Sequence, residues 1–206
     1  ILSFVSFHTT LSLLDYCKKI KTIVQVGSHD GEMHDPLREF ILKNKWTGLL
    51  IEPQKEMLEK CKQNYQNIDN LSFINLAVHP TKSNISLYKV ENPQDYSHTG
   101  WASINPERFT NTVYENRIKT ENVRALPLMQ IIKDNNFDSV DLLQIDTEGF
   151  DFKIIKMLDL SKISPEVIIF EEIHFDQPTI NACQTYLKNY GYTYNRIEKD
   201  VYATKF

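Results

Sequence analysis

The sequence predicts an α/β fold in which a mostly parallel sheet is covered by helices on both faces. Short apolar runs that read as buried strands alternate along the 206 residues with segments whose apolar positions recur at helical spacing. Several of these runs end on glycine or on acidic residues, as expected where parallel strands meet a ligand. The tail alternates on either side of Glu198-Lys199-Asp200, which predicts an antiparallel hairpin at one edge of the sheet.

Length and composition favour a single domain, residues 1–206, with a sizeable core. The formal net charge of −4 argues against a nucleic-acid-binding groove. No apolar stretch approaches the length that a bilayer requires, so we expect no membrane span. Cys17, Cys61 and Cys183 lie far apart and lack metal or redox spacing. This pattern predicts buried thiols in a reducing compartment, and hence a cytoplasmic protein.

The first third of the chain alternates between helices and strands. Thr9 or Thr10 is expected to cap a helix that runs to about Lys19. Asp35-Pro36 is a good start for a second helix, with the acid at the cap and the proline in the first turn. A third helix, 54–65, carries its apolar residues on one side. The strands predicted around these helices are 22–27, 46–51 and 72–78.

The middle of the chain is less regular. Residues 84–90 read as a strand, but 91–122 form a polar stretch with two prolines and few apolar positions. A loop of this length inside a compact domain is usually functional or poorly ordered, so we predict a lid or a substrate-binding insertion. Regular elements then return as strands at 123–126, 140–146 and 166–174, helices at 127–135, 152–158 and 178–190, and the hairpin strands 192–197 and 201–206.

Two neighbouring strand ends carry the clearest functional signal. The strand 22–27 runs into Gly27-Ser28-His29-Asp30-Gly31, and a buried strand that ends this way presents backbone N–H groups to a ligand. The next strand ends on Glu52, which is followed by Pro53. An acid at that place accepts hydrogen bonds from ribose hydroxyls, so the two ends together predict a site for a nucleotide-like cofactor.

The glycine loop indicates which cofactor. A dinucleotide site requires three glycines so that the backbone can approach a pyrophosphate, and this loop offers Gly27 and Gly31 with His29 and Asp30 between them. An acid in the loop would repel a pyrophosphate. It suits a cationic, hydroxyl-bearing ligand, and S-adenosylmethionine presents an ammonium, a sulfonium and a ribose without any phosphate.

Other strands of the predicted sheet also end on polar residues. In such sheets ligands bind beyond the carboxyl ends of the strands, and core packing alone does not require polar side chains there. The residues expected on this rim are Gly27–Gly31, Glu52, Asn75–Val78, Asp146 and Glu171–His174.

Five segments resemble the FkbM-type S-adenosylmethionine-dependent methyltransferases. They are Val26–Gly31, Ile51–Pro53, Asn75–Val78, Gly100–Ile104 and Leu143–Asp151. The specific part is the D-x-E-G-x-D segment from Asp146 to Asp151, which follows an apolar strand, and the resemblance extends over about residues 22–175. It implies a Rossmann-like, seven-stranded methyltransferase sheet and methyl transfer to oxygen, commonly on sugars or other glycosylated or polyketide-like small molecules.

The resemblance also implies roles for individual residues. The residues that would bind the cofactor are Gly27, Ser28, His29, Asp30, Gly31, Glu52, Asn75, Ala77 and Asp146. The loop would line the methionine portion, the acid after the second strand would hold the ribose, and Ala77 with its neighbours would edge the adenine. Asp146 would lie beside the methionine amine or the reacting centre. The chain departs from the family pattern at His29, where asparagine is frequent, and at Gln144, where lysine is frequent.

Methyl transfer to a hydroxyl is an in-line displacement, so its main requirement is to hold the acceptor oxygen behind the methyl group. A general base adds roughly 10²- to 10⁴-fold, and the candidates on the rim are His174, Asp146 and Glu171. We favour His174, because imidazole titrates nearest neutral pH and because two carboxylates, Glu171 and Glu172, precede it. A plain surface histidine at a strand end is the competing interpretation, and Asp146 fits a structural role in the cofactor pocket.

A metal site and two other functional classes stay as alternatives. The side chains of Asp146, Glu148, Asp151, Glu171 and His174 could in principle coordinate Mg²⁺, but nothing in their spacing makes them converge, so we expect no metal. A nicotinamide-dependent oxidoreductase would require the third glycine and a catalytic Tyr/Lys pair. A non-catalytic cofactor-binding module would keep the glycine loop and lose the residues on the acceptor side.

The acceptor is expected to be a small molecule with a hydroxyl group, most readily a sugar or glycoconjugate. Four aromatic residues in the long loop could stack on a sugar face, or could instead fold the loop onto the body of the domain. They are Tyr96, Trp101, Phe109 and Tyr114.

Overall fold

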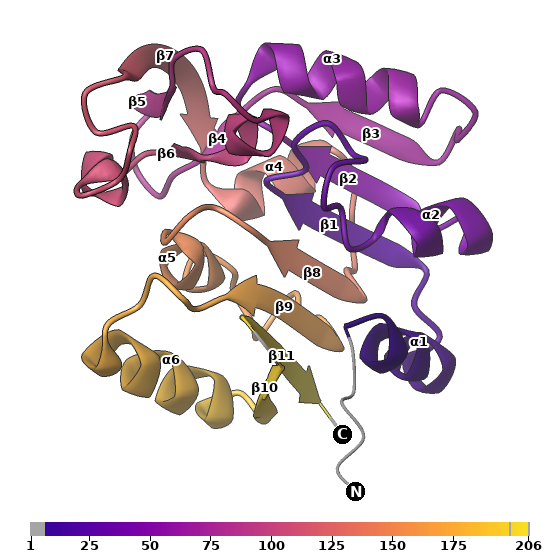
Figure 1. The fold of residues 1–206 in the computed structure, drawn as a ribbon. Helices are drawn as coiled ribbons and strands as arrows, with labels where there is room; N and C mark the ends of the chain where they lie inside the picture. Colours follow the sequence, from indigo (N-terminus) through magenta and orange to yellow (C-terminus); the bar gives the residue numbers. More distant parts are fainter. Residues whose placement is uncertain (1–6, 198, 206) are drawn as a thin grey trace, which may run out of the picture.

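A seven-stranded sheet forms the centre of the computed structural model, which describes residues 7–197 and 199–205 (Figure 1). Its strand order is β10-β11-β9-β8-β1-β2-β3. The pairings from β3 to β9 are parallel, and β11 runs antiparallel to both β9 and β10. The strands are β1 (Thr22–Val26), β2 (Thr47–Ile51), β3 (Leu71–Ile74), β8 (Leu142–Ile145), β9 (Val167–Glu171), β10 (Tyr192–Ile197) and β11 (Asp200–Lys205). The predicted α/β class, with its antiparallel hairpin, is confirmed.

Helices cover both faces of this sheet. Because side chains alternate along a strand, Val24 of β1 packs into the apolar cluster under α4, α5 and α6, whereas Ile23 packs into the cluster under α1, α2 and α3. The helices are α1 (Phe7–Lys18), α2 (Arg38–Asn44), α3 (Lys55–Asn64), α4 (Leu128–Asp134), α5 (Asp151–Ile155) and α6 (Gln177–Asn189). Along the described ranges, every helix is too short or too polar to cross a membrane.

A side-chain cap accounts for the start of α6, and two predicted helix starts differ from the structure. Thr9 and Thr10, one of which was expected to cap the first helix, both lie inside α1. The Asp176 side chain accepts a hydrogen bond from the Thr179 N–H at 2.9 Å, with a proline in the first turn, and α6 begins at Gln177. The second helix begins at Arg38 instead of at Asp35. Asp35 accepts hydrogen bonds from Gln25 at 2.9 Å and from Tyr65 at 2.7 Å, so its carboxylate ties the loop to the sheet and to α3.

A second, four-stranded sheet lies beside the first, in the order β4-β7-β5-β6. Its strands are β4 (Ala77–Val78), β5 (Asn84–Val90), β6 (Ala102–Ser103) and β7 (Ile118–Leu126). The predicted strand 72–78 is therefore wrong, because its two ends belong to different sheets. The break falls at Asn75, whose side-chain amide donates hydrogen bonds to the carbonyl oxygens of Glu52 and Pro53 at 3.0 and 2.9 Å.

The stretch 91–122 is more ordered than its composition suggested. The 3₁₀ turns η1 (Tyr96–Gly100) and η2 (Pro106–Phe109) flank β6, and β7 begins at Ile118, five residues before the strand predicted at 123. We call residues 91–117 the insertion segment. Phe109 and Tyr114 are 2% and 1% exposed and pack with Val90 into a small core of its own.

One further expectation differs from the structure, and one falls partly outside the described residues. Cys17 is exposed, because it lies on the solvent side of α1, while Cys61 and Cys183 are buried free thiols as predicted. The hairpin turn that was expected around residues 198–200 includes Glu198, which lies outside the described residues; Lys199 is described.

Leu143→Ala should lower the free energy of unfolding by about 2–5 kcal/mol, because Leu143 lies at the centre of the sheet and is 0% exposed. Leu13→Ala on α1, where the side chain is 63% exposed, is the control and should change it by about 0.5 kcal/mol or less. Urea unfolding followed by circular dichroism measures both, and equal effects of the two substitutions would contradict the assigned core.

Candidate active site

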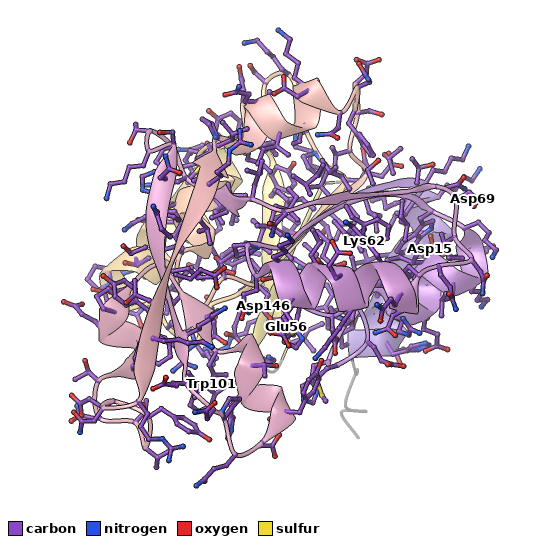
Figure 2. The ribbon with its side chains drawn as sticks, turned by 90° about the horizontal axis from the view of Figure 1, so that it is seen from above. Asp15, Glu56, Lys62, Asp69, Trp101 and Asp146 are labelled. Atoms are coloured by element: carbon purple, nitrogen blue, oxygen red, sulfur yellow. The ribbon has the colours of Figure 1, made fainter. Side chains whose placement is uncertain are left out.

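The carboxyl ends of β1, β2 and β8 open onto a cavity of about 340 Å³, within the size range of small-molecule sites. In Figure 2, Asp146 lies near the centre of the molecule and Trp101 lies beside the second sheet. The cavity is bounded by the glycine loop, the end of β2, the start of β4 and the insertion segment. Of the predicted cofactor-binding residues, those that line it are Gly27, Ser28, His29, Glu52, Ala77 and Asp146.

Gly27 brings β1 and β8 together. Its φ is +85°, and a Cβ atom built on it would lie 1.9 Å from the carbonyl oxygen of Asp146. No side chain fits in that space, and L-residues rarely adopt this backbone conformation. A glycine is therefore required for the end of β1 to approach the Asp146 backbone.

His29 and Glu52 connect the glycine loop to β2. The His29 N–H donates to Glu52 Oε2 at 3.0 Å, and the Gln54 N–H donates to Glu52 Oε1 at 2.8 Å. Burial raises the pKa of Glu52 to about 7, although these two hydrogen bonds favour its ionised form. The Gln54 side chain also hydrogen-bonds to this carboxylate, and because a carboxylate has about four acceptor positions, it can still accept a hydrogen bond from a ligand hydroxyl.

The His29 ring faces the insertion segment, with Nε2 at 2.8 Å from Thr99 Oγ1. Burial lowers the pKa of His29, against the opposing charge of Asp30. The imidazole is thus a neutral hydrogen-bonding group at the edge of the cavity.

Asp30, Gly31 and Asn75 do not line the cavity. Asp30 Oδ1 accepts the N–H groups of Glu32 and Met33, and Oδ2 accepts the Tyr96 hydroxyl at 2.7 Å. Burial alone would raise the pKa of Asp30, but these hydrogen bonds lower it below its ordinary value. A Cβ on Gly31 would lie 2.6 Å from the Tyr65 ring, so Gly31 allows close packing on α3. Asp30, Gly31 and Asn75 therefore support the residues that line the cavity without lining it themselves.

Asp146 stands at the end of β8 and is exposed to the cavity. Enclosure by the surrounding protein raises its pKa well above the ordinary value, and the negative charges of Asp151, Glu171 and Glu148 raise it further. Asp151 is 0% exposed, and its Oδ2 accepts hydrogen bonds from the Thr147 hydroxyl and the Gly149 N–H. It therefore folds the loop after β8. Burial raises the pKa of Asp151 to about 7.

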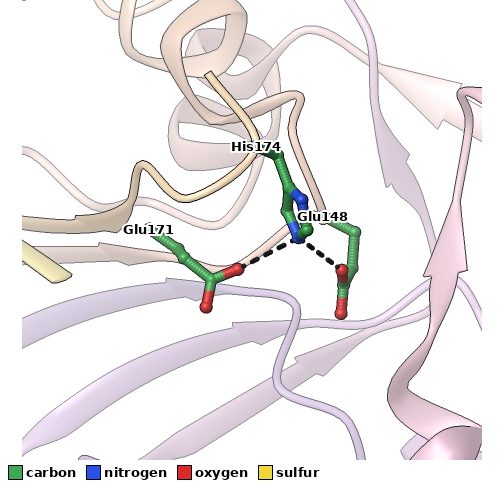
Figure 3. A group of neighbouring side chains, drawn as sticks. All are labelled: Glu148, Glu171 and His174. Atoms are coloured by element: carbon green, nitrogen blue, oxygen red, sulfur yellow. Dashed lines mark ion pairs between the residues drawn. The ribbon is translucent and has the colours of Figure 1, made fainter. Parts of the chain in front are cut away.

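His174 lies between two carboxylates (Figure 3). Its Nε2 is 3.0 Å from Glu148 Oε2 and 3.5 Å from Glu171 Oε2. Glu172, expected to join Glu171 there, instead contacts Tyr194 and Arg196 of β10. Successive residues at the end of a strand point to opposite faces, which separates these two acids.

Two cations complete this group. Arg108 Nε lies 2.6 Å from the Glu148 oxygen that faces His174, and Lys199 Nζ lies 2.9 Å from Glu171 Oε1. Sequence reasoning paired His174 with Glu171 and grouped Glu148 with them only as a possible Mg²⁺ ligand, and it missed Arg108 and Lys199 as neighbours of this group. The D-x-E-G-x-D segment could have indicated Glu148 as a site residue. No pattern in the sequence points to Arg108 or Lys199.

The ligand atoms of Glu148, Glu171 and His174 lie within 4.8 Å of one another, a spacing that a metal ion could bridge. Each carboxylate is already paired with a cation, Arg108 or Lys199, so much of its negative charge is balanced. These three side chains therefore fit an imidazole held in place by carboxylates better than they fit a binding site for a metal cation.

The insertion segment closes one side of the cavity. His98 and Trp101 line it, and the Thr99 carbonyl accepts a hydrogen bond from Gln54 Nε2 at 3.1 Å. The Ser103 hydroxyl donates to the Glu148 carbonyl at 3.3 Å. Of the four aromatic residues considered for sugar stacking, Trp101 lines the cavity. Phe109 and Tyr114 form the small core of the segment, and the Tyr96 hydroxyl donates to Asp30.

Comparisons with known proteins agree on the fold. The sequence model of the family described as "Methyltransferase FkbM domain" matches residues 25–194. Methyltransferase FkbM from Methylobacillus flagellatus KT superposes with a TM-score of 0.55 at 14% identity, over 89% of this chain and 43% of that one. The N-terminal domain of human METTL16 in complex with SAH superposes with a TM-score of 0.51 at 11% identity, over 98% of this chain and 70% of that one. At these identities the structural likeness shows the fold alone. A search of curated proteins gave no match.

Glu52→Gln should flatten the pH dependence of stability. The folded-state pKa of about 7 lies above the ordinary 4.5, so the folded protein binds this proton more tightly and loses stability as pH rises from about 4.5 to about 7. The loss is at most about 3 kcal/mol and is absent in Glu52→Gln.

Urea unfolding at pH 5 and pH 8 measures this difference. Glu59→Gln, whose side chain is 52% exposed on α3, serves as the control and should behave as the wild type. An identical pH dependence in wild type and Glu52→Gln would contradict the burial of this carboxyl.

Proposed function

The chain belongs to the FkbM family of methyltransferase domains, and from this premise we propose that it methylates a hydroxyl of a small molecule with S-adenosylmethionine as donor. Family membership supports methyl transfer from this donor in general. The finer proposal concerns the acceptor, which we take to be a sugar or a glycosylated metabolite. A small-molecule acceptor also agrees with the net charge of −4, which disfavours nucleic acid.

The meeting of Gly27, Glu52 and Asp146 at one cavity is the observation that carries this proposal. Carboxylates project into or border the cavity from the ends of both β2 and β8, which favours a cationic ligand and disfavours a pyrophosphate. Glu52 retains lone pairs for ribose hydroxyls, and the volume of about 340 Å³ suits a ligand of this size. The residues present therefore fit S-adenosylmethionine, which supplies an electrophilic methyl group on a sulfonium.

We propose that the protein contributes to methyl transfer by positioning the two substrates and by accepting one proton. The glycine loop and Glu52 hold the donor, so that the acceptor oxygen can be placed in line behind the methyl group. As the oxygen–carbon bond forms and the carbon–sulfur bond breaks, the hydroxyl proton moves to the His174 imidazole. His174 is not itself among the residues that line the donor cavity, but it contacts Glu148, which lines it. Asp146 faces the cavity beside the methionine amine or the reacting centre, and Glu171 supports His174 at 3.5 Å.

The insertion segment is the proposed acceptor wall and lid. It supplies Trp101 and His98 to the cavity, and an aromatic face there can pack against a sugar ring. The buried free thiols of Cys61 and Cys183 fit a reducing compartment, and we propose the cytoplasm as the location.

Purified protein incubated with methyl-labelled S-adenosylmethionine and a panel of sugars, glycosides and nucleotide sugars should transfer label to at least one hydroxyl. His174→Gln should lower kcat by about 10²- to 10⁴-fold without weakening donor binding, because it removes the base and leaves the cofactor cavity intact. His8→Gln is the control, since its side chain lies 57% exposed on α1, away from the cavity.

Label found on nitrogen in place of oxygen would contradict O-methylation. Donor binding with no turnover on any acceptor would favour the non-catalytic module, and binding of NAD⁺ in preference to the methyl donor would favour the oxidoreductase.

A further inference from the structure

We propose that Glu148 is a positioning residue that fixes the neutral tautomer of His174, and that Arg108 of the insertion segment holds Glu148 in place for this task. In this arrangement Nδ1 of His174 carries the lone pair with which the imidazole can act as a base. The proposal rests on the proposed function, in which His174 is the general base. It adds the residues that orient the base and connects them to the segment over the cavity.

The tautomer follows from the surroundings of Nε2. This nitrogen lies 3.0 Å from Glu148 Oε2 and 3.5 Å from Glu171 Oε2 (Figure 3). A bare lone pair on Nε2 would face two negative oxygens and be repelled, whereas an N–H there is attracted by both. The neutral ring therefore carries its hydrogen on Nε2, which leaves the lone pair on Nδ1.

Glu148 is held as an ion in a restricted position. Burial alone would raise its pKa, but the contacts with His174 and Arg108 lower the pKa below its ordinary value. Both cation and acid are shielded, with side-chain exposures of 14% for Arg108 and 15% for Glu148. Arg108 Nε and His174 Nε2 approach the same oxygen, Oε2, from different elements. This geometry directs the carboxylate at the imidazole.

The backbone around Glu148 also serves this placement. Glu148 has a φ of +55°, which is uncommon for a residue with a side chain. Gly149, with φ +101°, lies so close to His174 that a Cβ on it would be 3.2 Å from the His174 Cβ. The Ser103 hydroxyl holds the Glu148 carbonyl from the insertion segment. The loop after β8 is thus shaped around the histidine.

Arg108 is itself anchored in the insertion segment. Its guanidinium lies over the Trp101 ring, 4.8 Å from the centroid, and Trp101 packs edge-on against Tyr114 at 5.9 Å. Tyr114 is 1% exposed in the segment's own core. The far end of the same segment contacts the glycine loop through Thr99 and Tyr96. One segment therefore touches both the cofactor loop and the support of the base, so its docking assembles the two together.

The charged groups around His174 come from several elements. Glu148 follows β8, Glu171 ends β9, Arg108 belongs to η2 and Lys199 to the hairpin turn. His174 itself lines a second hollow, together with Lys153, Lys156 and Asp176, and it is not among the residues that line the donor cavity. Glu148 and Glu171 contact Nε2 directly, and of these two only Glu148 is linked to the insertion segment by an ion pair in the described structure.

The test compares Glu148→Leu, Glu148→Asp and Arg108→Gln with the wild type. Arg117→Gln is the matched control, because Arg117 lies over Tyr114 at 5.2 Å in the same segment and has no role at His174. ¹⁵N shifts of the His174 ring, recorded at alkaline pH with S-adenosylhomocysteine bound, report the tautomer without any turnover. We expect the wild type to carry hydrogen on Nε2.

Glu148→Leu should raise the fraction of His174 rings with hydrogen on Nδ1, because the nearer of the two acceptors of the Nε2–H is lost, and kcat should fall by about 10²- to 10⁴-fold at unchanged KM for the methyl donor. Arg108→Gln should lower kcat about tenfold through the loss of one charge-assisted contact, and Glu148→Asp should retain part of the activity and the wild-type tautomer.

Hydrogen on Nδ1 in the wild type would overturn this proposal, and so would a folded Glu148→Leu variant with unchanged tautomer and kcat. A wild type with hydrogen on Nε2 but no turnover would overturn the proposed function and still support the positioning of His174.

Discussion

The close approach of Gly27 to the Asp146 backbone is the constraint on which the site depends. A Cβ at residue 27 would lie 1.9 Å from the Asp146 carbonyl oxygen, so the ends of β1 and β8 can meet only if this residue lacks a side chain. That contact aligns the glycine loop with the loop after β8. From the first loop the His29 N–H reaches Glu52, and from the second Glu148 reaches His174. One backbone contact thus helps to place both Glu52 and Glu148 at the cavity.

The same contact concentrates acidic groups at one edge of the sheet, and this has an energetic consequence. Burial raises the pKa of both Glu52 and Asp151 to about 7, and it raises that of Asp146 as well. Ionising such groups near neutral pH costs stability, and a cationic ligand bound beside them would offset that cost. Arg108 and Lys199 already neutralise the outer acids. Of these acids, Glu52 and Asp146 line the cavity, and neither has an ion pair among the described residues, so the field there favours a positively charged ligand.

The positions of the buried strands could be predicted from the sequence, whereas contacts between residues far apart in the chain could not. The apolar runs gave β1, β2, β8 and β9 to within two or three residues, because buried parallel strands are continuous apolar segments. The break at Asn75 was missed, since a strand that leaves one sheet for another keeps its β pattern. The order inside residues 91–117 was missed too, because Phe109 and Tyr114 form a core too small to show periodicity. At the site, Glu171 and His174 are neighbours in sequence, whereas Arg108 reaches Glu148 across forty positions, a distance that no local pattern encodes.

Calorimetric titration with S-adenosylhomocysteine tests the central claim most directly, with NAD⁺ titrated alongside and Glu52→Ala and Glu59→Ala as paired variants. The account predicts binding of S-adenosylhomocysteine in preference to NAD⁺. It also predicts that Glu52→Ala weakens binding by about ten- to a hundredfold, as the loss of hydrogen bonds to a charged group requires, and that Glu59→Ala has no effect. A folded protein that binds neither ligand, or that binds NAD⁺ more tightly, would contradict the assignment of this cavity to a methyl donor.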